Sequence, residues 1–342
     1  MSVTRNVTIG EIGVALPENV VSNEDLRAAY PDWDFDRLAA RTGVMSRHIA
    51  APDETALDLA FAACESLRET GALDDNGGID GLLFCTETPD FPIPSNACLL
   101  HGRLELPQDV LALDINMGCS GYLYALEVAR SLIVSGAASR ILLATADTYS
   151  RLINPGDRST RVLFGDGAAV SVITRADDDQ SGILDLKLGS EGKFHDRFMV
   201  PAGGARRPLD DSTAVETEDK SGNIRTPADI TMEGFQVLSF FNGVIPKHVR
   251  GVLEANDLTL DDVDLFVFHQ ASQVALDSIA KALKIPAEKF VNKLATTGNL
   301  VSASVPVALQ MAREDGSAAP GKLAILCGFG VGLSWGTALV RL

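Results

Sequence analysis

The amino-acid sequence predicts an α/β fold built from two duplicated halves, and two observations carry this prediction. Strand-like apolar runs alternate with helix-like runs along the whole chain of 342 residues. Such alternation is typical of sheets that are largely parallel and buried beneath helices. Landmarks of the first half also recur in the second half at a nearly constant distance, which indicates an internal duplication.

The predicted strands are short apolar runs bounded by turn residues. The N-terminal stretch 1–16 has an early arginine but no continuous apolar block before a cleavage site. We therefore interpret it as a first strand and not as a signal peptide. The other predicted strands are IDGLLFCTE, DVLALDINM, SRILLATA and AVSVITRA in the first half, and VDLFVFHQA and KLAILCGFG in the second.

The duplication divides the chain near its middle. The polar run DDDQSG has the composition of a linker, so the predicted domains are residues 1–178 and 179–342. Three pairs of landmarks support this division. They are Asp80 with Asp264, Cys119 with Asn299, and Ile141 with Leu323, which lie 184, 180 and 182 residues apart.

Composition and charge restrict the class of protein. Hydrophobic residues make up 46% and charged residues 22% of the chain, and no apolar run is long enough to cross a membrane. The net charge of −17 argues against binding to nucleic acid. The five cysteines form no CxxC pair, so we expect neither a disulfide framework nor a metal site, and we expect a cytoplasmic location.

Three reactive side chains fall at matching places in the two halves. Cys119 and Asn299 each follow a glycine and precede a helix-like run, and His269 directly follows the apolar run VDLFVF. A helix N-terminus favours the thiolate of a cysteine, which is the nucleophilic form. Because α/β proteins place their chemistry at the carboxyl ends of strands, we expect sulfur, imidazole and carboxamide to meet at one site.

These residues lie in local sequences that resemble the thiolase superfamily, and most closely its β-ketoacyl-acyl carrier protein synthase III branch. The similar stretches are ARTGV, the cysteine turn GCSGY, FGDGAAV, HQAS, TTGNLVSASVPVAL and the closing run GFGVGLSWGTALVRL. The resemblance implies a thiolase-like, five-layered αβαβα fold, a homodimer, and a decarboxylative condensation. It also implies acyl-CoA and a malonyl thioester as substrates, acyl carrier protein as a candidate partner, and no permanently bound cofactor.

The resemblance assigns a role to each reactive group. Cys119 would accept the acyl group, while His269 and Asn299 would bind the malonyl thioester carbonyl and promote the loss of CO2. The backbone N–H groups of Cys119 and Val331 would bind the oxyanion. Both the imidazole N–H and the amide are donors suited to an enolate oxygen.

Further positions would bind CoA or line the acyl pocket, and several depart from the family pattern. Arg37, Arg41, Arg158 and Ser272 are the expected CoA-binding residues, and Ile93 lies in the loop expected to cross the dimer interface. The departures are Arg37 in place of tryptophan, Phe235 and Ser272 in place of asparagine, Val274 in place of a basic residue, Val331 in place of glycine, and Ile93 in place of phenylalanine. These departures leave the acyl donor and the carrier open.

The stretch 196–229 is rich in Pro, Gly, Arg and Asp and lacks periodicity. Two interpretations stay open for it, a disordered surface loop and a lid over the acyl channel.

Four other functions stay open as alternatives. One is a condensation of two acyl-CoA molecules without decarboxylation, which needs a glutamate to remove an α-proton, and Glu87 is the residue available for it. Another is acyl transfer to an alcohol or amine. A cysteine hydrolase shares the order Cys, His, Asn but places its cysteine in different local sequence. A catalytically inactive scaffold is the fourth.

Overall fold

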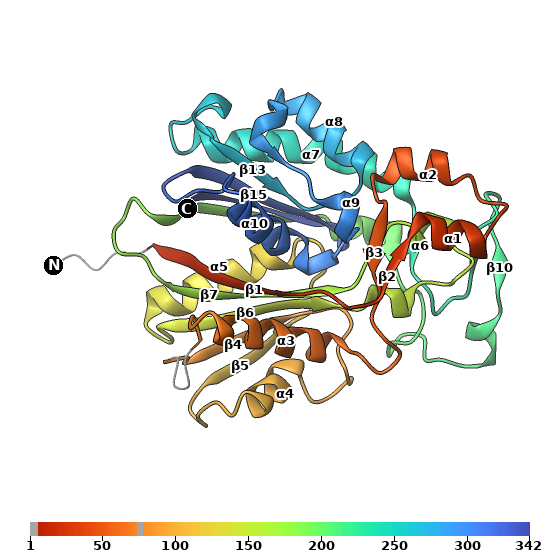
Figure 1. The fold of residues 1–342 in the computed structure, drawn as a ribbon, viewed down its shortest axis with the longest axis horizontal. Helices are drawn as coiled ribbons and strands as arrows, with labels where there is room; N and C mark the ends of the chain where they lie inside the picture. Colours follow the sequence, from red (N-terminus) through yellow and green to blue (C-terminus); the bar gives the residue numbers. More distant parts are fainter. Residues whose placement is uncertain (1–5, 74–77) are drawn as a thin grey trace.

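Two five-stranded sheets and three short two-stranded ones make up the β-structure in a computed structural model that describes residues 6–73 and 78–342 (Figure 1). The first sheet has the order β1-β7-β6-β4-β5 and the second the order β14-β13-β15-β16-β8. The strands of the first sheet are β1 (Val7–Ala15), β4 (Gly81–Cys85), β5 (Leu111–Ile115), β6 (Arg140–Asp147) and β7 (Gly167–Arg175). Those of the second are β8 (Gly182–Ser190), β13 (Leu265–Phe268), β14 (Phe290–Val291), β15 (Leu323–Gly330) and β16 (Ser334–Arg341).

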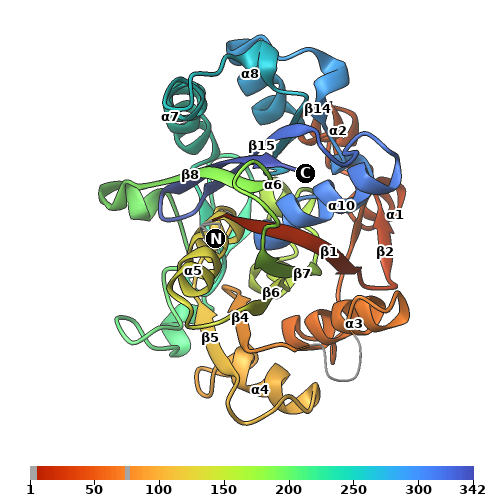
Figure 2. The same cartoon turned by 90° about the vertical axis from the view of Figure 1, so that its left-hand side faces the viewer.

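Helices cover both sheets and also separate them. Helices α3 and α4 pack on the outer face of the first sheet, and α7 covers the outer face of the second with α8 beside it. Between the sheets lie α5 and α10, each of which contacts strands of both (Figures 1 and 2). The bounds are α3 (Ala56–Glu69), α4 (Asn96–Arg103), α5 (Gly121–Ser135), α7 (Gly234–Glu254), α8 (Gln273–Leu283) and α10 (Ser304–Glu314). The predicted five-layered arrangement is confirmed.

The pairing of the strands differs from the largely parallel pairing that the sequence predicted. In the first sheet β4 pairs in parallel with β5 and β6, but β7 is antiparallel to both β1 and β6. The second sheet repeats this mixture, because β16 is antiparallel to β15 and β8. Helical layers on both faces make every central strand apolar along its length, so the hydrophobic pattern cannot distinguish the two kinds of pairing.

The two halves share a detail that confirms their duplication. The carboxylate of Asp80 accepts a hydrogen bond of 2.8 Å from the N–H of Arg140, at the start of β6. In the second half the carboxylate of Asp264 accepts one of 2.9 Å from the N–H of Leu323, at the start of β15. In both halves an aspartate before one strand therefore fixes the entry of its parallel neighbour.

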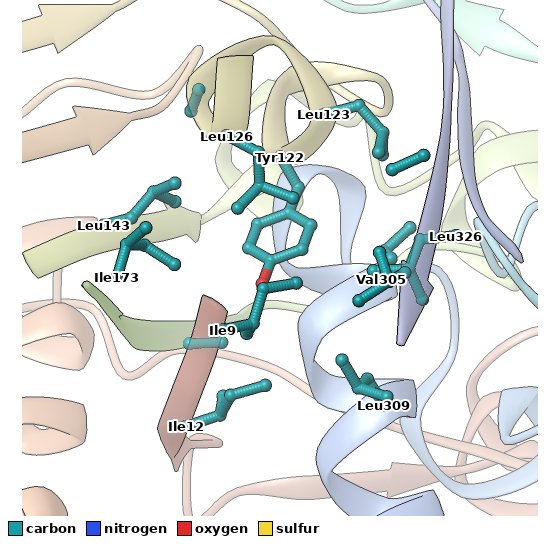
Figure 3. Packing of buried hydrophobic residues seen from close by; sticks show 14 of the residues in the cluster. Ile9, Ile12, Tyr122, Leu123, Leu126, Leu143, Ile173, Val305, Leu309 and Leu326 are labelled. Carbon is teal, nitrogen blue, oxygen red and sulfur yellow. The ribbon is translucent and has the colours of Figure 1, made fainter. Parts of the chain in front are cut away.

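The central layer joins the halves into one core (Figure 3). Tyr122 of α5 packs among Ile9 of β1 and side chains of both sheets, and its hydroxyl lies 3.1 Å from Ser171 Oγ. Leu309 of α10 and Leu326 of β15 belong to the same cluster. Burying a side chain of this size contributes about 1.5–3 kcal/mol, so these contacts stabilise the packing of α5 and α10 between the sheets. The two halves therefore share one core, and the boundary between residues 1–178 and 179–342 stays a prediction.

Short elements gather at one end of the sheets, on the right of Figure 1. They are β2 (Val20–Ser22), α1 (Asn23–Ala29), α2 (Phe35–Thr42), β3 (Ser46–His48), α6 (Arg158–Arg161), β9 (Phe198–Met199), β10 (Thr217–Glu218), β11 (Ile224–Arg225), β12 (Thr231–Met232) and α9 (Leu294–Thr297). Single 3-10 turns complete the chain at Tyr149–Leu152, Gly192–Arg197, Asp211–Ala214, Leu260–Asp262, Ala287–Lys289 and Val301–Ala303.

The stretch 196–229 is held against the body of the protein. Arg225 Nε donates to Asp157 Oδ2 at 2.6 Å, and Asn154 Nδ2 donates to Asp229 Oδ2 at 3.1 Å. The stretch therefore has fixed contacts with the loop before α6. Across the described ranges, none of the helices combines the length and the hydrophobicity that crossing a bilayer requires.

Candidate active site

Cys119 lies in the turn between β5 and α5, two residues before the helix begins. Its side chain is 2% exposed. The end of β15 passes so close that a Cβ added to Gly330 would lie 2.4 Å from Cys119 Cβ and 2.7 Å from Sγ. The backbone N–H groups of Val331 and of Cys119 itself act on the sulfur and favour its negative form. These are the two N–H groups that the resemblance assigned to the oxyanion.

Burial controls the ionisation of this thiol. Desolvation raises the pKa of Cys119, and the nearby carboxyls of Glu87 and Asp147 raise it further. The two backbone N–H groups lower the pKa, but burial outweighs them. The N–H groups at this turn therefore favour the thiolate as expected, but desolvation is the larger effect and leaves the pKa of the thiol above its ordinary value.

His269 directly follows β13, and its backbone N–H donates to the carbonyl of Cys327 at 2.7 Å. The ring stands edge-on to Phe329, with centroids 5.7 Å apart and an interplanar angle of 88°. Burial lowers the pKa of the imidazole to about 3. Nδ1 is buried and has no hydrogen-bond partner within the described part of the chain. The ring is therefore neutral and offers one N–H donor.

Asn299 follows Gly298, whose φ of +68° is a conformation that favours glycine. The amide oxygen accepts a hydrogen bond of 2.9 Å from the N–H of Val301, which fixes the orientation of the side chain. Its Nδ2 makes only a long contact of 3.4 Å to the carbonyl of Ala271. The amide N–H groups are thus available to a ligand.

A single cavity of roughly 620 Å³ brings the three predicted side chains together, since Cys119, His269 and Asn299 all line it. The four predicted CoA-binding residues line the same cavity, namely Arg37, Arg41, Arg158 and Ser272. Ile93 is not among the lining residues, and its side chain is 85% exposed on the loop after β4. Phe235 and Val274, two of the departures from the family pattern, are exposed residues of the lining.

Two of the predicted CoA-binding residues already have partners. Arg158 donates to the carbonyl of Ser221, in the stretch 196–229. The hydroxyl of Ser272 accepts a hydrogen bond of 3.3 Å from the N–H of Ala275 and caps α8. Arg37 and Arg41 are exposed on α2. The stretch 196–229 also contributes Asp219, Ser221, Asn223 and Arg225 to the cavity lining.

Two acids lie near the nucleophile, the half-buried Glu87 and the buried Asp147. Glu87 accepts a hydrogen bond from the hydroxyl of Tyr149, and burial raises the pKa of Glu87 to about 7. The N–H of Glu87 donates to Asp147 Oδ1 at 2.9 Å. Asp147 Oδ2 in turn accepts from the N–H of Ser302 at 3.2 Å, and burial raises the pKa of Asp147 to about 7. Asp147 thereby links the Glu87 loop of the first half to the Asn299 loop of the second.

Sequence reasoning missed four residues of this site. Asp147 ends a buried strand, and this position could have marked it as a site residue. Gly330 could have been found as a glycine of the closing run GFGVG. Nothing in the sequence pattern distinguishes Tyr149 or Phe329 from core aromatics, because both are buried like their neighbours.

Comparison with known proteins gives matches in both halves of the chain. Residues 113–192 match the family described as 3-Oxoacyl-[acyl-carrier-protein (ACP)] synthase III, and residues 253–342 match its C-terminal part. The beta-ketoacyl-[acyl-carrier-protein] synthase III of Rhodopirellula baltica is 36% identical over 355 residues, covering 98% of this chain and 99% of the relative. The synthase III 3 of Streptomyces coelicolor is 36% identical over 336 residues, covering 98% and 97%.

Solved structures agree with these matches. The crystal structure of a 3-oxoacyl-(acyl-carrier-protein) synthase III is 40% identical to this chain and covers 98% of it and all of its own length, with a TM-score of 0.96. The corresponding enzyme of Pseudomonas aeruginosa is 34% identical with a TM-score of 0.84, and the match covers 98% of each chain. The similarity therefore extends over both sheets and over the residues that line the cavity.

Proposed function

The chain belongs to the 3-oxoacyl-[acyl-carrier-protein] synthase III family, and on that premise we propose that Cys119, His269 and Asn299 carry its reaction. The protein is an acyltransferase of fatty-acid biosynthesis that forms a 3-oxoacyl thioester by condensation. The observation that carries the assignment is the cavity in which these three side chains meet.

In the first step Cys119 Sγ attacks the thioester carbonyl of acyl-CoA. A new C–S bond forms to Cys119, the bond to the CoA sulfur breaks, and the thiol proton of Cys119 leaves with CoA. The N–H groups of Cys119 and Val331 act on the sulfur, so they are placed to bind the carbonyl oxygen as it gains negative charge. This balance fits a thiol that is protonated at rest.

In the second step a malonyl thioester enters the vacated cavity. Loss of CO2 leaves its electron pair on the α-carbon, and the enolate oxygen is held by the N–H donors of His269 and Asn299. The carbanion attacks the acyl carbonyl, the C–S bond to Cys119 breaks, and the Cys119 thiolate that leaves takes a proton from water. A well-placed donor of this kind contributes about 3–4 kcal/mol. The neutrality of His269 supports the assignment, because an imidazole with a pKa of about 3 donates without changing charge.

The central test is intact-mass analysis after incubation with a panel of acyl-CoA thioesters. Wild type should gain one acyl group, and Cys119→Ala should gain none. A matched control is Cys98→Ala, which removes the exposed cysteine and should leave acylation unchanged. Adducts that persist on Cys119→Ala would remove this residue from the mechanism.

The condensation step needs its own measurement. The release of CO2 is measured separately with malonyl-CoA and with malonyl-acyl carrier protein. The faster of the two identifies the group that carries the malonyl thioester. Replacing His269 by Ala should lower decarboxylation by roughly 100–1,000-fold and spare acylation, since one enolate donor is lost. Equal loss of both steps would contradict the roles given to Cys119 and His269.

The path to the cavity supports CoA and a carrier protein as partners. Arg37 and Arg41 project from α2 beside the cavity, where they could meet the phosphates of CoA. Charge reversal at Arg41 should raise the KM for acyl-CoA more than it lowers kcat. Val274 and Phe235 give the rim an apolar character where the family pattern has polar residues. A carrier protein that docks here would meet fewer charges than the family pattern provides.

A homodimer is part of the same proposal. Ile93 and Phe91 are 85% and 53% exposed on the loop after β4, which is unfavourable for apolar side chains in a monomer. Light scattering after gel filtration should give the mass of two chains for wild type. Ile93→Asp should weaken the association, while Val20→Asp, at another half-exposed apolar residue, should not. The five free cysteines are consistent with a reducing compartment, and we place the enzyme in the cytoplasm.

A further inference from the structure

We propose that Asp147 is a positioning residue for the malonyl step, because it holds the turn after Asn299 in the conformation that directs the Asn299 amide into the cavity. Asp147 is not among the residues that line the cavity, so it acts through Ser302 and not on the substrate. This inference deepens the function proposed above and rests on the enolate-binding role given to Asn299.

The backbone and the side chain of Asn299 are held by different groups. Its backbone N–H donates to the carbonyl of Leu163 at 2.9 Å, and its carbonyl accepts from the N–H of Gly165 at 3.0 Å. The side chain has a separate support, since Oδ1 accepts from the N–H of Val301 at 2.9 Å. Nδ2 makes only the long contact of 3.4 Å to the carbonyl of Ala271. The direction of the amide N–H groups therefore depends on where the N–H of Val301 points.

Val301 adopts a backbone conformation that a β-branched residue rarely accepts. Its φ is +52°, in the left-handed region, and the residue is fully buried. Such a conformation is unfavourable for valine and persists only where the surrounding contacts enforce it. The turn Val301–Ala303 therefore needs a partner that holds it in place.

Asp147 is a partner of this turn. It ends β6 and is fully buried, and its Oδ2 accepts from both the N–H and the hydroxyl of Ser302, at 3.2 and 2.5 Å. Its Oδ1 accepts from the N–H of Glu87 at 2.9 Å and from the hydroxyl of Thr86 at 3.3 Å. The two oxygens thus bind neutral donors on two loops, one in each half of the chain. A carboxylate suits this place because it accepts at both oxygens and donates at neither.

The double hydrogen bond fixes both the position and the orientation of Ser302, which directly follows Val301. Its acceptor is attached to β6, a strand with β4 and β7 on either side of it. Without this link the turn can relax from its unfavourable conformation, and the N–H of Val301 would then turn away from Asn299 Oδ1. The amide would lose its direction, although the backbone of Asn299 would stay in place.

The two steps of the reaction should respond differently to the loss of this link. Acylation takes place on Cys119, which lies on a separate turn before α5. Asp147 raises the pKa of the Cys119 thiol, so replacing Asp147 should not hinder the ionisation of that thiol. The release of CO2 depends on the Asn299 amide, and we expect this step to slow.

The test measures both steps in Asp147→Asn and Ser302→Ala. Acylation by the acyl-CoA that acylates wild type is followed by intact mass, and CO2 release is measured with the malonyl thioester that wild type uses faster. Asp147→Asn replaces one acceptor by a donor and should slow CO2 release by roughly 10–100-fold, since a displacement of about 1 Å can cost 100-fold. Ser302→Ala keeps its backbone N–H and should lose less, about 10-fold. Acylation should stay close to that of wild type in both variants.

A double variant shows whether the effect passes through Asn299. Asn299→Ala alone should slow CO2 release by roughly 100–1,000-fold, since one enolate donor is lost. If Asp147 acts through this amide, adding Asp147→Asn to Asn299→Ala should cause little further loss. A merely structural effect would instead multiply the loss, and this result would overturn the inference.

Ser171→Ala is the matched control. It removes another fully buried hydroxyl, which lies 3.1 Å from that of Tyr122, and it should release CO2 at the wild-type rate. If Asp147→Asn does not fold, Ser302→Ala decides by the same criteria, alone and together with Asn299→Ala. Equal loss of acylation and CO2 release would overturn the inference. So would a wild-type rate of CO2 release in Asp147→Asn, and if Asn299→Ala is slow in that case, the proposed function stands and the inference alone fails. A wild-type rate in Asn299→Ala would refute the role of Asn299 and the inference with it.

Discussion

Replacing Gly330 by Ala tests whether the close approach of β15 to the nucleophile sets the position of the sulfur. The added Cβ would lie 2.4 Å from Cys119 Cβ and 2.7 Å from Sγ. Ordinary carbon contacts begin near 3.4 Å, so the turn and the strand must separate by about 1 Å. Because Gly330 pairs with Ser334 of β16, the end of β15 resists this movement and part of the shift falls on Cys119.

Two magnitudes follow from this shift. Overpacking of a close-packed site costs about 1–3 kcal/mol, so the free energy of unfolding in urea should fall by that amount. A displacement of about 1 Å at a reacting atom can lower a rate by roughly 100-fold, so acylation by acyl-CoA should slow to that extent. The acylation rate is measured by intact mass at short times, at protein concentrations matched to wild type.

A matched glycine supplies the control. Gly251 lies on α7 and an added Cβ there would meet nothing within 4 Å. Gly251→Ala should therefore stabilise the protein by up to about 1 kcal/mol, because alanine favours a helix, and should leave acylation unchanged. If Gly330→Ala acylates as fast as wild type, the sulfur is not positioned by β15 and the reasoning fails.

Three other substitutions have definite expected outcomes. The pKa of His269 falls from 6.5 to about 3 in the folded protein, so the unfolded chain binds the extra proton as pH drops below 6.5 and stability is lost. Between about pH 7 and pH 5 wild type should lose about 2 kcal/mol more than His269→Ala in urea unfolding, and equal losses would contradict a buried neutral imidazole. Arg225→Ala leaves the buried carboxylate of Asp157 without its 2.6 Å partner, so unfolding free energy should fall by about 3 kcal/mol, with Arg225→Lys intermediate. Gly118→Ala forces its Cβ against Glu87 Oε2 and should slow the acylation of Cys119, measured by intact mass. An unchanged acylation rate would show that the space beside Gly118 accepts a methyl group.

Much of the fold follows from the sequence because the patterns that predict it are local. The six apolar runs assigned as strands all form strands, and the landmarks Asp80 and Asp264 hold equivalent places in the two sheets. The prediction that the strands pair largely in parallel was wrong. Antiparallel strands such as β7 and β16 lie under helices on both faces. Their side chains are therefore apolar in either kind of pairing, and the pattern does not indicate the direction of the neighbouring strands.

The active site likewise has some features that the sequence predicts and others that it does not. Cys119, His269 and Asn299 were predictable because each stands at the end of a patterned run, and all three line one cavity. The partnership of Tyr149 with Glu87 was not predictable, because 62 residues separate them in the chain. Nor was the protonated state of the Cys119 thiol, since it results from burial among acids contributed by separate loops.

The sequence alone determined the α/β elements, the duplication, the three reactive residues and the family to which they belong, because each is encoded in short runs and their spacing. Tertiary structure decided the mixed strand pairing, the raised pKa of Glu87 and the neutrality of His269. These properties depend on desolvation and on contacts between distant segments, and neither exists until the two halves enclose their shared core.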